Sequence, residues 1–133
     1  MSNKKLGSDF EREFAQILDN HGFWVHLMAQ NAAGQPFDVL AARNGKTYPI
    51  DCKVCVNDYF RLDRVEDNQR LSMWKWRERG NKHGWFALKL SNGDIWMVAD
   101  KTIEQFASDG FHTMTSRMIA NYGFLIEEWV EIY

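Results

Sequence analysis

The chain contains little proline and little cysteine, and it has no long apolar run. It holds two prolines and two cysteines in 133 residues. Two cysteines are too few for the disulfide framework of a small secreted protein. No stretch approaches the roughly 18 apolar residues of a membrane span, so we expect no membrane partner. Residues 1–7 include two lysines but no apolar segment follows, so we expect no secretory signal and a cytoplasmic location.

A net positive charge is also missing. The formal net charge is −2, which by itself does not predict a nucleic-acid partner. The distribution is uneven, however: residues 61–89 hold eight basic and four acidic side chains, whereas residues 100–133 hold two basic and six acidic ones. A basic middle is compatible with a surface that faces phosphates. A solvated charged helix explains the same charges equally well.

Periodicity and turn residues predict an alternation of helices and strands. Apolar residues recur at helical spacing from Phe10 to Leu18, after a helix cap expected at Ser8 or Asp9. The turns at 44–45 and 92–93 are both Asn-Gly, the strongest short hairpin signal. We expect strands at 23–28, 37–42, 47–56, 85–90 and 95–99, further helices at 65–79 and 101–107, and a polar connection at 58–64. This order predicts an α/β fold with a mixed sheet, and the segment 111–133 has no clear periodicity.

Asp51 and Lys53 stand two residues apart in one expected strand, so their side chains project from the same face. Cys52 points to the other face, where a buried thiol fits. Asp38 lies across the hairpin turn among apolar residues, where an aspartate is unfavourable unless something compensates for it. A divalent cation would compensate, because Mg²⁺ binds carboxylates and keeps phosphate oxygens as further ligands.

Glu11 on the first helix is the natural third acid of such a site. Glu13 cannot face the same site, because two residues turn a helix by about 200°. A bound metal would lower the pKa of its water and stabilise charge developing at phosphorus, and Lys53 would orient that water. The ordinary alternative is that Asp51 and Lys53 belong to a solvated strand face.

Cys52 and Cys55 form a lone C-x-x-C inside the expected strand. No second pair of cysteines or histidines completes a zinc set, so we predict buried structural thiols. A redox or metal role is the alternative, and Cys52 stays among the candidate metal ligands on that basis.

Together these motifs resemble the PD-(D/E)xK nuclease superfamily, and within it the Holliday junction resolvases. Residues 7–12, Gly-Ser-Asp-Phe-Glu-Arg, are similar to the G-S-x-x-E-R start of the archaeal resolvases. Residues 37–45 resemble their P-D-I-I-A-x-x-N-G strand and turn, and residues 50–53 stand where they have hydrophobic-E-x-K. Residues 59–62, Tyr-Phe-Arg-Leu, followed by Gln69 resemble the bacterial RecU resolvases.

The resemblance implies a restriction-endonuclease-like αβββαβ core at about residues 5–99, with a C-terminal extension at 100–133 in a single nuclease domain. It implies a homodimeric endonuclease that uses Mg²⁺, or Mn²⁺ in its place, to cut four-way junctions or other branched DNA. Carried over to this chain, the metal ligands are Glu11, Asp38 and Asp51. Lys53 is then the catalytic lysine and Gln69 an accessory catalytic residue.

Two positions depart from the family pattern. Pro36 precedes Phe37 rather than the aspartate, and Asp51 replaces the more usual glutamate. No counterpart of residues 111–133 is identified. As candidate contacts to DNA phosphates we name four basic residues: Lys4, Lys5, Arg12 and Arg70.

Three functions remain open from the sequence. A structure-specific endonuclease, most simply a Holliday junction resolvase, is favoured. A restriction-type or repair nuclease acting on duplex or flap DNA is the alternative, and a non-catalytic DNA-binding module is the third. The complete set of three acids and a lysine argues against the third, because a nuclease that has lost its activity usually lacks at least one of them.

Overall fold

The structure is a computed structural model that describes residues 2–30, 32 and 34–133. It contains the predicted helices and strands in the predicted order, with an additional short strand before the second helix and further short elements after the third. The helices are α1 Asn3–Asn20, α2 Asp67–Glu78, α3 Asp100–Ser108, α4 Ser116–Tyr122 and α5 Ile126–Ile132, with a 3-10 turn at Leu62–Arg64. The strands are β1 Trp24–Leu27, β2 Val39–Arg43, β3 Lys46–Cys55, β4 Tyr59–Arg61, β5 Trp85–Leu90, β6 Ile95–Ala99, β7 Thr113–Thr115 and β8 Phe124–Leu125.

Helix α1 begins earlier than predicted, and the predicted cap at Ser8 or Asp9 is wrong. Ser2 is the cap, since its hydroxyl accepts a hydrogen bond from the Lys5 N–H at 3.2 Å. Lysine and leucine in the first turn favour helix strongly enough to carry it through Gly7. Asp9 lies inside the helix and forms ion pairs with Lys5 and Arg12.

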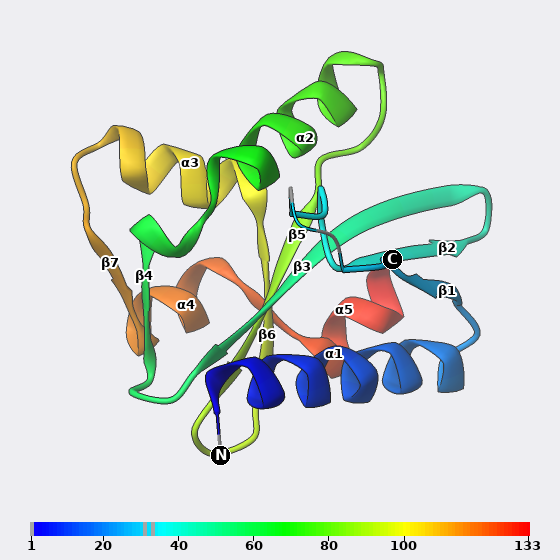
Figure 1. The fold of residues 1–133 in the computed structure, drawn as a ribbon, viewed down its shortest axis with the longest axis horizontal. Helices are drawn as coiled ribbons and strands as arrows, with labels where there is room; N and C mark the ends of the chain where they lie inside the picture. Colours follow the sequence, from blue (N-terminus) through cyan, green and yellow to red (C-terminus); the bar gives the residue numbers. More distant parts are fainter. Residues whose placement is uncertain (1, 31, 33) are drawn as a thin grey trace.

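A six-stranded mixed sheet forms the centre of the molecule, in the order β1-β2-β3-β5-β6-β8 (Figure 1). Strands β3 and β5 run parallel and the other neighbours are antiparallel, so the predicted mixed sheet is confirmed. Asn44 and Gly45 have φ values of 55° and 78°. Two positive φ values are what a type I′ hairpin turn requires, and they set the register that places Asp38 beside β3.

Helices cover both faces of this sheet. The core on one face joins α1 and α5 to the sheet, and the core on the other joins α2, α3 and α4 to it. Figure 1 shows α1 on one side of the twisted strands and α2 with α3 on the opposite side. Cys52 lies in the first core and Cys55 in the second, both as free buried thiols. The prediction that both thiols are buried is therefore confirmed.

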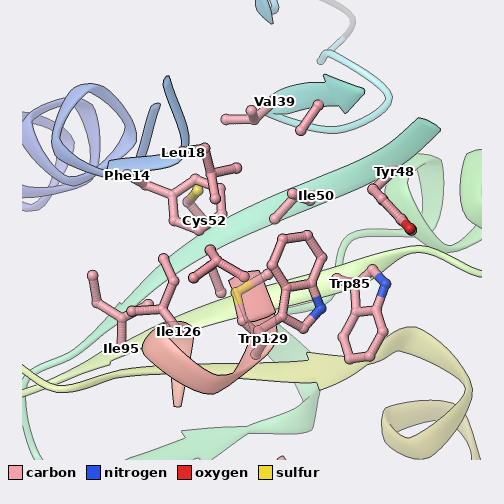
Figure 2. Close-up of a cluster of buried hydrophobic side chains, with 14 of the residues drawn as sticks. Phe14, Leu18, Val39, Tyr48, Ile50, Cys52, Trp85, Ile95, Ile126 and Trp129 are labelled. Atoms are coloured by element: carbon pink, nitrogen blue, oxygen red, sulfur yellow. The ribbon is translucent and has the colours of Figure 1, made fainter. Parts of the chain in front are cut away.

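Trp129 of α5 is the largest fully buried side chain and the centre of the first core. Its ring stacks on Phe23 at 5.5 Å between centroids, and it meets Tyr48 and Trp85 edge-on at 5.4 and 5.7 Å. Figure 2 shows this indole against strands β3 and β5, with Cys52 farther along the same face. The face of the sheet opposite Asp51 and Lys53 is thus closed by an aromatic cluster.

The tail and the predicted polar connection hold more structure than the sequence indicated. Strand β4, which lies within the predicted connection 58–64, pairs antiparallel with β7 of the tail to form a two-stranded ribbon. Farther along the tail, β8 adds a strand to the main sheet. These elements are two to seven residues long, too short for periodicity to mark them. No helix in the described part of the chain is long and apolar enough to cross a bilayer.

Candidate active site

Asp38 directly precedes β2, at the point where β3 continues beyond its pairing with β2. Its N–H donates to the Ile50 carbonyl at 3.1 Å, just outside the paired residues of β2. Farther along β3, the N–H of Cys52 donates to Asp38 Oδ2 at 2.8 Å. The carboxylate therefore takes the place of a strand partner. This bond fixes a buried acid, 6% exposed, in the gap beside β3.

Asp51 and Lys53 lie together on the α2 side of β3, as their spacing predicts. Asp51 is fully buried, and Lys53 Nζ lies 3.2 Å from its Oδ2. Gln69 Nε2 donates to Asp51 Oδ1 at 2.7 Å. Gln69 Oε1 accepts from the Glu66 N–H at 3.2 Å and faces Lys53 Nζ at 3.4 Å. One amide thus caps α2 and holds both the acid and the lysine.

Glu11 approaches Asp38 from α1. Burial, and after it the negative charge of the nearby Asp38 carboxylate, raise the pKa of Glu11 from 4.5 to about 7. Glu13 lies elsewhere and pairs with Lys89 at 2.6 Å. Of the two glutamates on this helix, Glu11 is the one that faces the other carboxylates.

The carboxyl groups are held together at an electrostatic cost. Burial raises the pKa of Asp51 well above its ordinary value, the charge of Asp38 raises it further, and Lys53 acts in the opposite direction. Asp51 Oδ2 is buried and finds no hydrogen-bond donor of suitable geometry among the described residues, even though the Lys53 ammonium is near. A buried acceptor in this state is costly unless a cation satisfies it.

These residues fit a hard divalent cation. Carboxylate oxygens are its preferred ligands, and a positive charge would offset the repulsion among Glu11, Asp38 and Asp51 and would satisfy the orphaned Oδ2. No three His, Cys, Asp or Glu side chains within residues 2–30, 32 and 34–133 already form a metal cage. Metal binding therefore requires the three acids to draw closer than they stand here.

Cys52 meets the site only through its backbone. Its sulfur lies in the first core, and burial raises the pKa of the thiol well above its ordinary value, with the nearby carboxylates raising it further. In a strand the N–H and C=O of one residue point the same way, so the Cys52 carbonyl shares the Asp38 side of β3. A metal ligand from Cys52 would be this oxygen and not the thiolate.

The basic residues predicted to contact phosphates are spread over two places. Lys5 and Arg12 flank Asp9 on α1, and Arg70 lies 3.6 Å from Asp67 on α2. Lys4 is exposed on the first turn of α1. Three of the four basic residues therefore form an ion pair with an aspartate.

Gln35 is a site residue that the sequence did not single out. Its side-chain Nε2 donates to Asp38 Oδ1 at 2.9 Å, while its backbone carbonyl accepts from Asn68 Nδ2 at 2.9 Å. A glutamine three residues before an aspartate is no signal by itself, because the contact depends on where α2 holds the loop. Together with the Cys52 N–H, Gln35 occupies both oxygens of Asp38.

Comparisons with known proteins identify the family and the fold. The family model for archaeal Holliday junction resolvases (Hjc) matches residues 2–132, and so includes the tail that the sequence motifs left out. The structure of Hjc from Archaeoglobus fulgidus, a Holliday junction resolvase, has a similar fold, with a TM-score of 0.70 and 19% identity over 93% of this chain and 99% of that one. A search of curated proteins found no match.

Proposed function

This chain belongs to the archaeal Holliday junction resolvase family, and from that premise we propose that Glu11, Asp38, Asp51 and Lys53 form its catalytic centre. As a member of this family it is a Holliday junction resolvase, an endonuclease that acts on branched DNA and depends on divalent metal ions. The observation that carries the assignment is the buried Asp51, held by Gln69 and facing Lys53, beside Asp38. Nothing in a purely structural strand would favour such a set of charges.

We propose that Glu11, Asp38, Asp51 and the carbonyl of Cys52 hold the metal, and that the ion is Mg²⁺, with Mn²⁺ as a substitute. When bound, it supplies an acidified water and charge stabilisation at the phosphate. All four donors are oxygen atoms, which these hard ions prefer. Asp51 is fixed by a hydrogen bond at one oxygen and Asp38 by hydrogen bonds at both, which limits how far they have to reorganise.

Lys53 is the residue that we assign to the attacking water and to the developing negative charge. Its side chain is 13% exposed and its ammonium lies between Asp51 and Gln69, so it is oriented on two sides. A compact cation with three donors can hold a water and a phosphate oxygen together. Gln69 acts on the reaction by keeping Asp51 and Lys53 in place.

We also propose that residues 1–133 form one nuclease domain that works as a homodimer on four-way junctions. The tail supports a single domain, because β8 extends the main sheet and α5 fills its core. The homodimer follows from the reaction, since two opposed cuts across a junction need two sites and each chain carries one such cluster. Light scattering of the purified protein with and without a four-way junction tests the stoichiometry.

Cleavage of a four-way junction with Mg²⁺ or EDTA tests the catalytic assignment. The wild-type protein should give paired symmetric nicks with Mg²⁺ only, and Asp51→Asn should bind the junction without cutting it. Asp100→Asn is the matched control, because Asp100 is also buried with a raised pKa but lies beside Arg77, outside the cluster. Cutting by Asp51→Asn at the wild-type rate would refute the assignment. Equal cutting of plain duplex would remove only the junction specificity.

A further inference from the structure

A cationic hollow opens beside Lys53. Its volume is about 390 Å³, and it lies between the first turns of α1, the end of β3 and the β4 strand. Lys53 lines it, so the hollow is continuous with the catalytic strand. The further side chains that matter here are Arg61 on β4 and Arg64 at the end of the 3-10 turn.

The charge of this hollow has one sign. Three cations line it and no carboxylate does. Lys53 already pairs with Asp51 in the active site, so the cations of the hollow that remain for a further anion are Arg61 and Arg64. Arg61 has one acidic neighbour, Asp63 at 3.4 Å, but the side chains are 60% and 76% exposed. An ion pair so open to water is weak and yields readily to a phosphate.

Arg64 is held in place by its surroundings. Its Nη1 donates to the Val54 carbonyl at 2.9 Å, one residue beyond Lys53, and its guanidinium lies 5.7 Å from the Phe60 ring. No carboxylate within the described residues makes an ion pair with it. A guanidinium that is fixed by neutral partners and keeps other N–H groups free is preorganised for an anion.

We propose that this hollow binds the sugar-phosphate backbone of the DNA strand next to the cleaved bond, with Arg64 and Arg61 each contacting a phosphate. The inference rests on the proposed function, because Lys53 marks the end of the hollow at which the cut is made. The first turn of α1 adds the positive end of a helix on the third side. These contacts position the strand without reading its sequence.

The salt dependence of junction binding in EDTA tests the proposal without any cleavage. Each lost phosphate contact should reduce the slope of log affinity against log salt by about one, and lower the affinity about tenfold at low salt. We expect this for Arg61→Gln and for Arg64→Gln, with retention in Arg64→Lys. Arg79→Gln removes the same charge from an exposed position outside the hollow and should leave the slope unchanged.

Neutral methylphosphonates, placed one at a time near the cut, locate the contact. One position should weaken binding by the wild-type protein and have no further effect on Arg61→Gln or Arg64→Gln. If the effects of the variant and of the methylphosphonate multiply at every position, or if the slopes of the variants equal that of Arg79→Gln, the hollow is not the phosphate site. Thermal melting excludes unfolding of Arg64→Gln, and Arg61 is too exposed for its loss to disturb the fold. Wild-type cleavage with Mg²⁺ is scored separately, so failure of the proposed function is distinguishable.

Discussion

Replacing Glu11 with glutamine should stabilise the metal-free protein at alkaline pH. Glu11 is partly buried near Asp38, and its pKa is raised from 4.5 to about 7. Between these values the folded protein keeps a proton that the unfolded chain has already released. The stability of the wild-type protein therefore falls as pH rises from about 4.5 to 7, and it stays lowered above that range. Glutamine keeps the shape and the hydrogen-bonding capacity but never becomes charged.

The size of this effect follows from the shift. The full rise corresponds to at most about 3 kcal/mol. Since Glu11 is partly open to solvent, we expect about half of it, roughly 1–2 kcal/mol at pH 8. That is a gain in Tm of roughly 3–8 °C for Glu11→Gln over the wild-type protein in EDTA. At pH 4.5, where Glu11 is protonated in the folded protein and only half ionised in the unfolded chain, the two melting temperatures should nearly agree.

Thermal melting followed by circular dichroism at pH 4.5 and pH 8, in EDTA and in Mg²⁺, measures this. Glu13→Gln is the control on the same helix: Glu13 pairs with Lys89, so its loss should leave Tm unchanged or slightly lower at pH 8. Saturating Mg²⁺ should raise the Tm of the wild-type protein more than that of Glu11→Gln, because the stabilisation by a bound ion grows with the logarithm of its affinity. An equal Tm for wild type and Glu11→Gln at pH 8 in EDTA would refute the reasoning.

Three other substitutions test separate parts of the structure. Gln69→Ala removes a helix cap and a hydrogen bond to a buried charge, so it should lower the free energy of unfolding in urea by about 2–3 kcal/mol. It should also lower kcat more than it raises KM, and an unchanged kcat would contradict the positioning role of Gln69. Cys52→Ala should keep the Mn²⁺ affinity measured by calorimetry, at a cost of about 1 kcal/mol in stability, because the thiol faces the core; loss of Mn²⁺ binding would instead make the sulfur a ligand. Trp129→Ala should cost about 3–5 kcal/mol in urea unfolding, and a cost below 1 kcal/mol would show that α5 is dispensable.

The central hairpin and the second one were predictable because their turns carry strong local signals. The β5 and β6 boundaries agree with the predicted strands at 85–90 and 95–99. The start of α1 was not predictable, because a serine at position 2 is as good a helix cap as one at position 8, and local preference does not choose between them. The ribbon of β4 and β7 joins segments more than 50 residues apart, and no local pattern encodes such a pairing.

The active site, like the fold, was predictable from the sequence only in part. The alternation of side chains along a strand is enough to place Asp51 and Lys53 together, and the hairpin turn brings Asp38 near them. The place of Gln69 follows from the resemblance to known resolvases, because its contact with Asp51 depends on how α2 packs on the sheet. Gln35 and Arg64 owe their places to loop packing, which the sequence alone does not express.

The aromatic cluster around Trp129 ties the nuclease to the order in which its chain is synthesised. Phe23, Tyr48 and Trp85 are covered by α5, which emerges from the ribosome more than 40 residues after the last of them. Until then one side of the catalytic strand exposes a broad apolar patch of the kind that chaperones bind and that promotes aggregation. The scaffold of the active site is thus complete only after α5 has been translated. A nascent chain stalled before α5 would be a target for quality control.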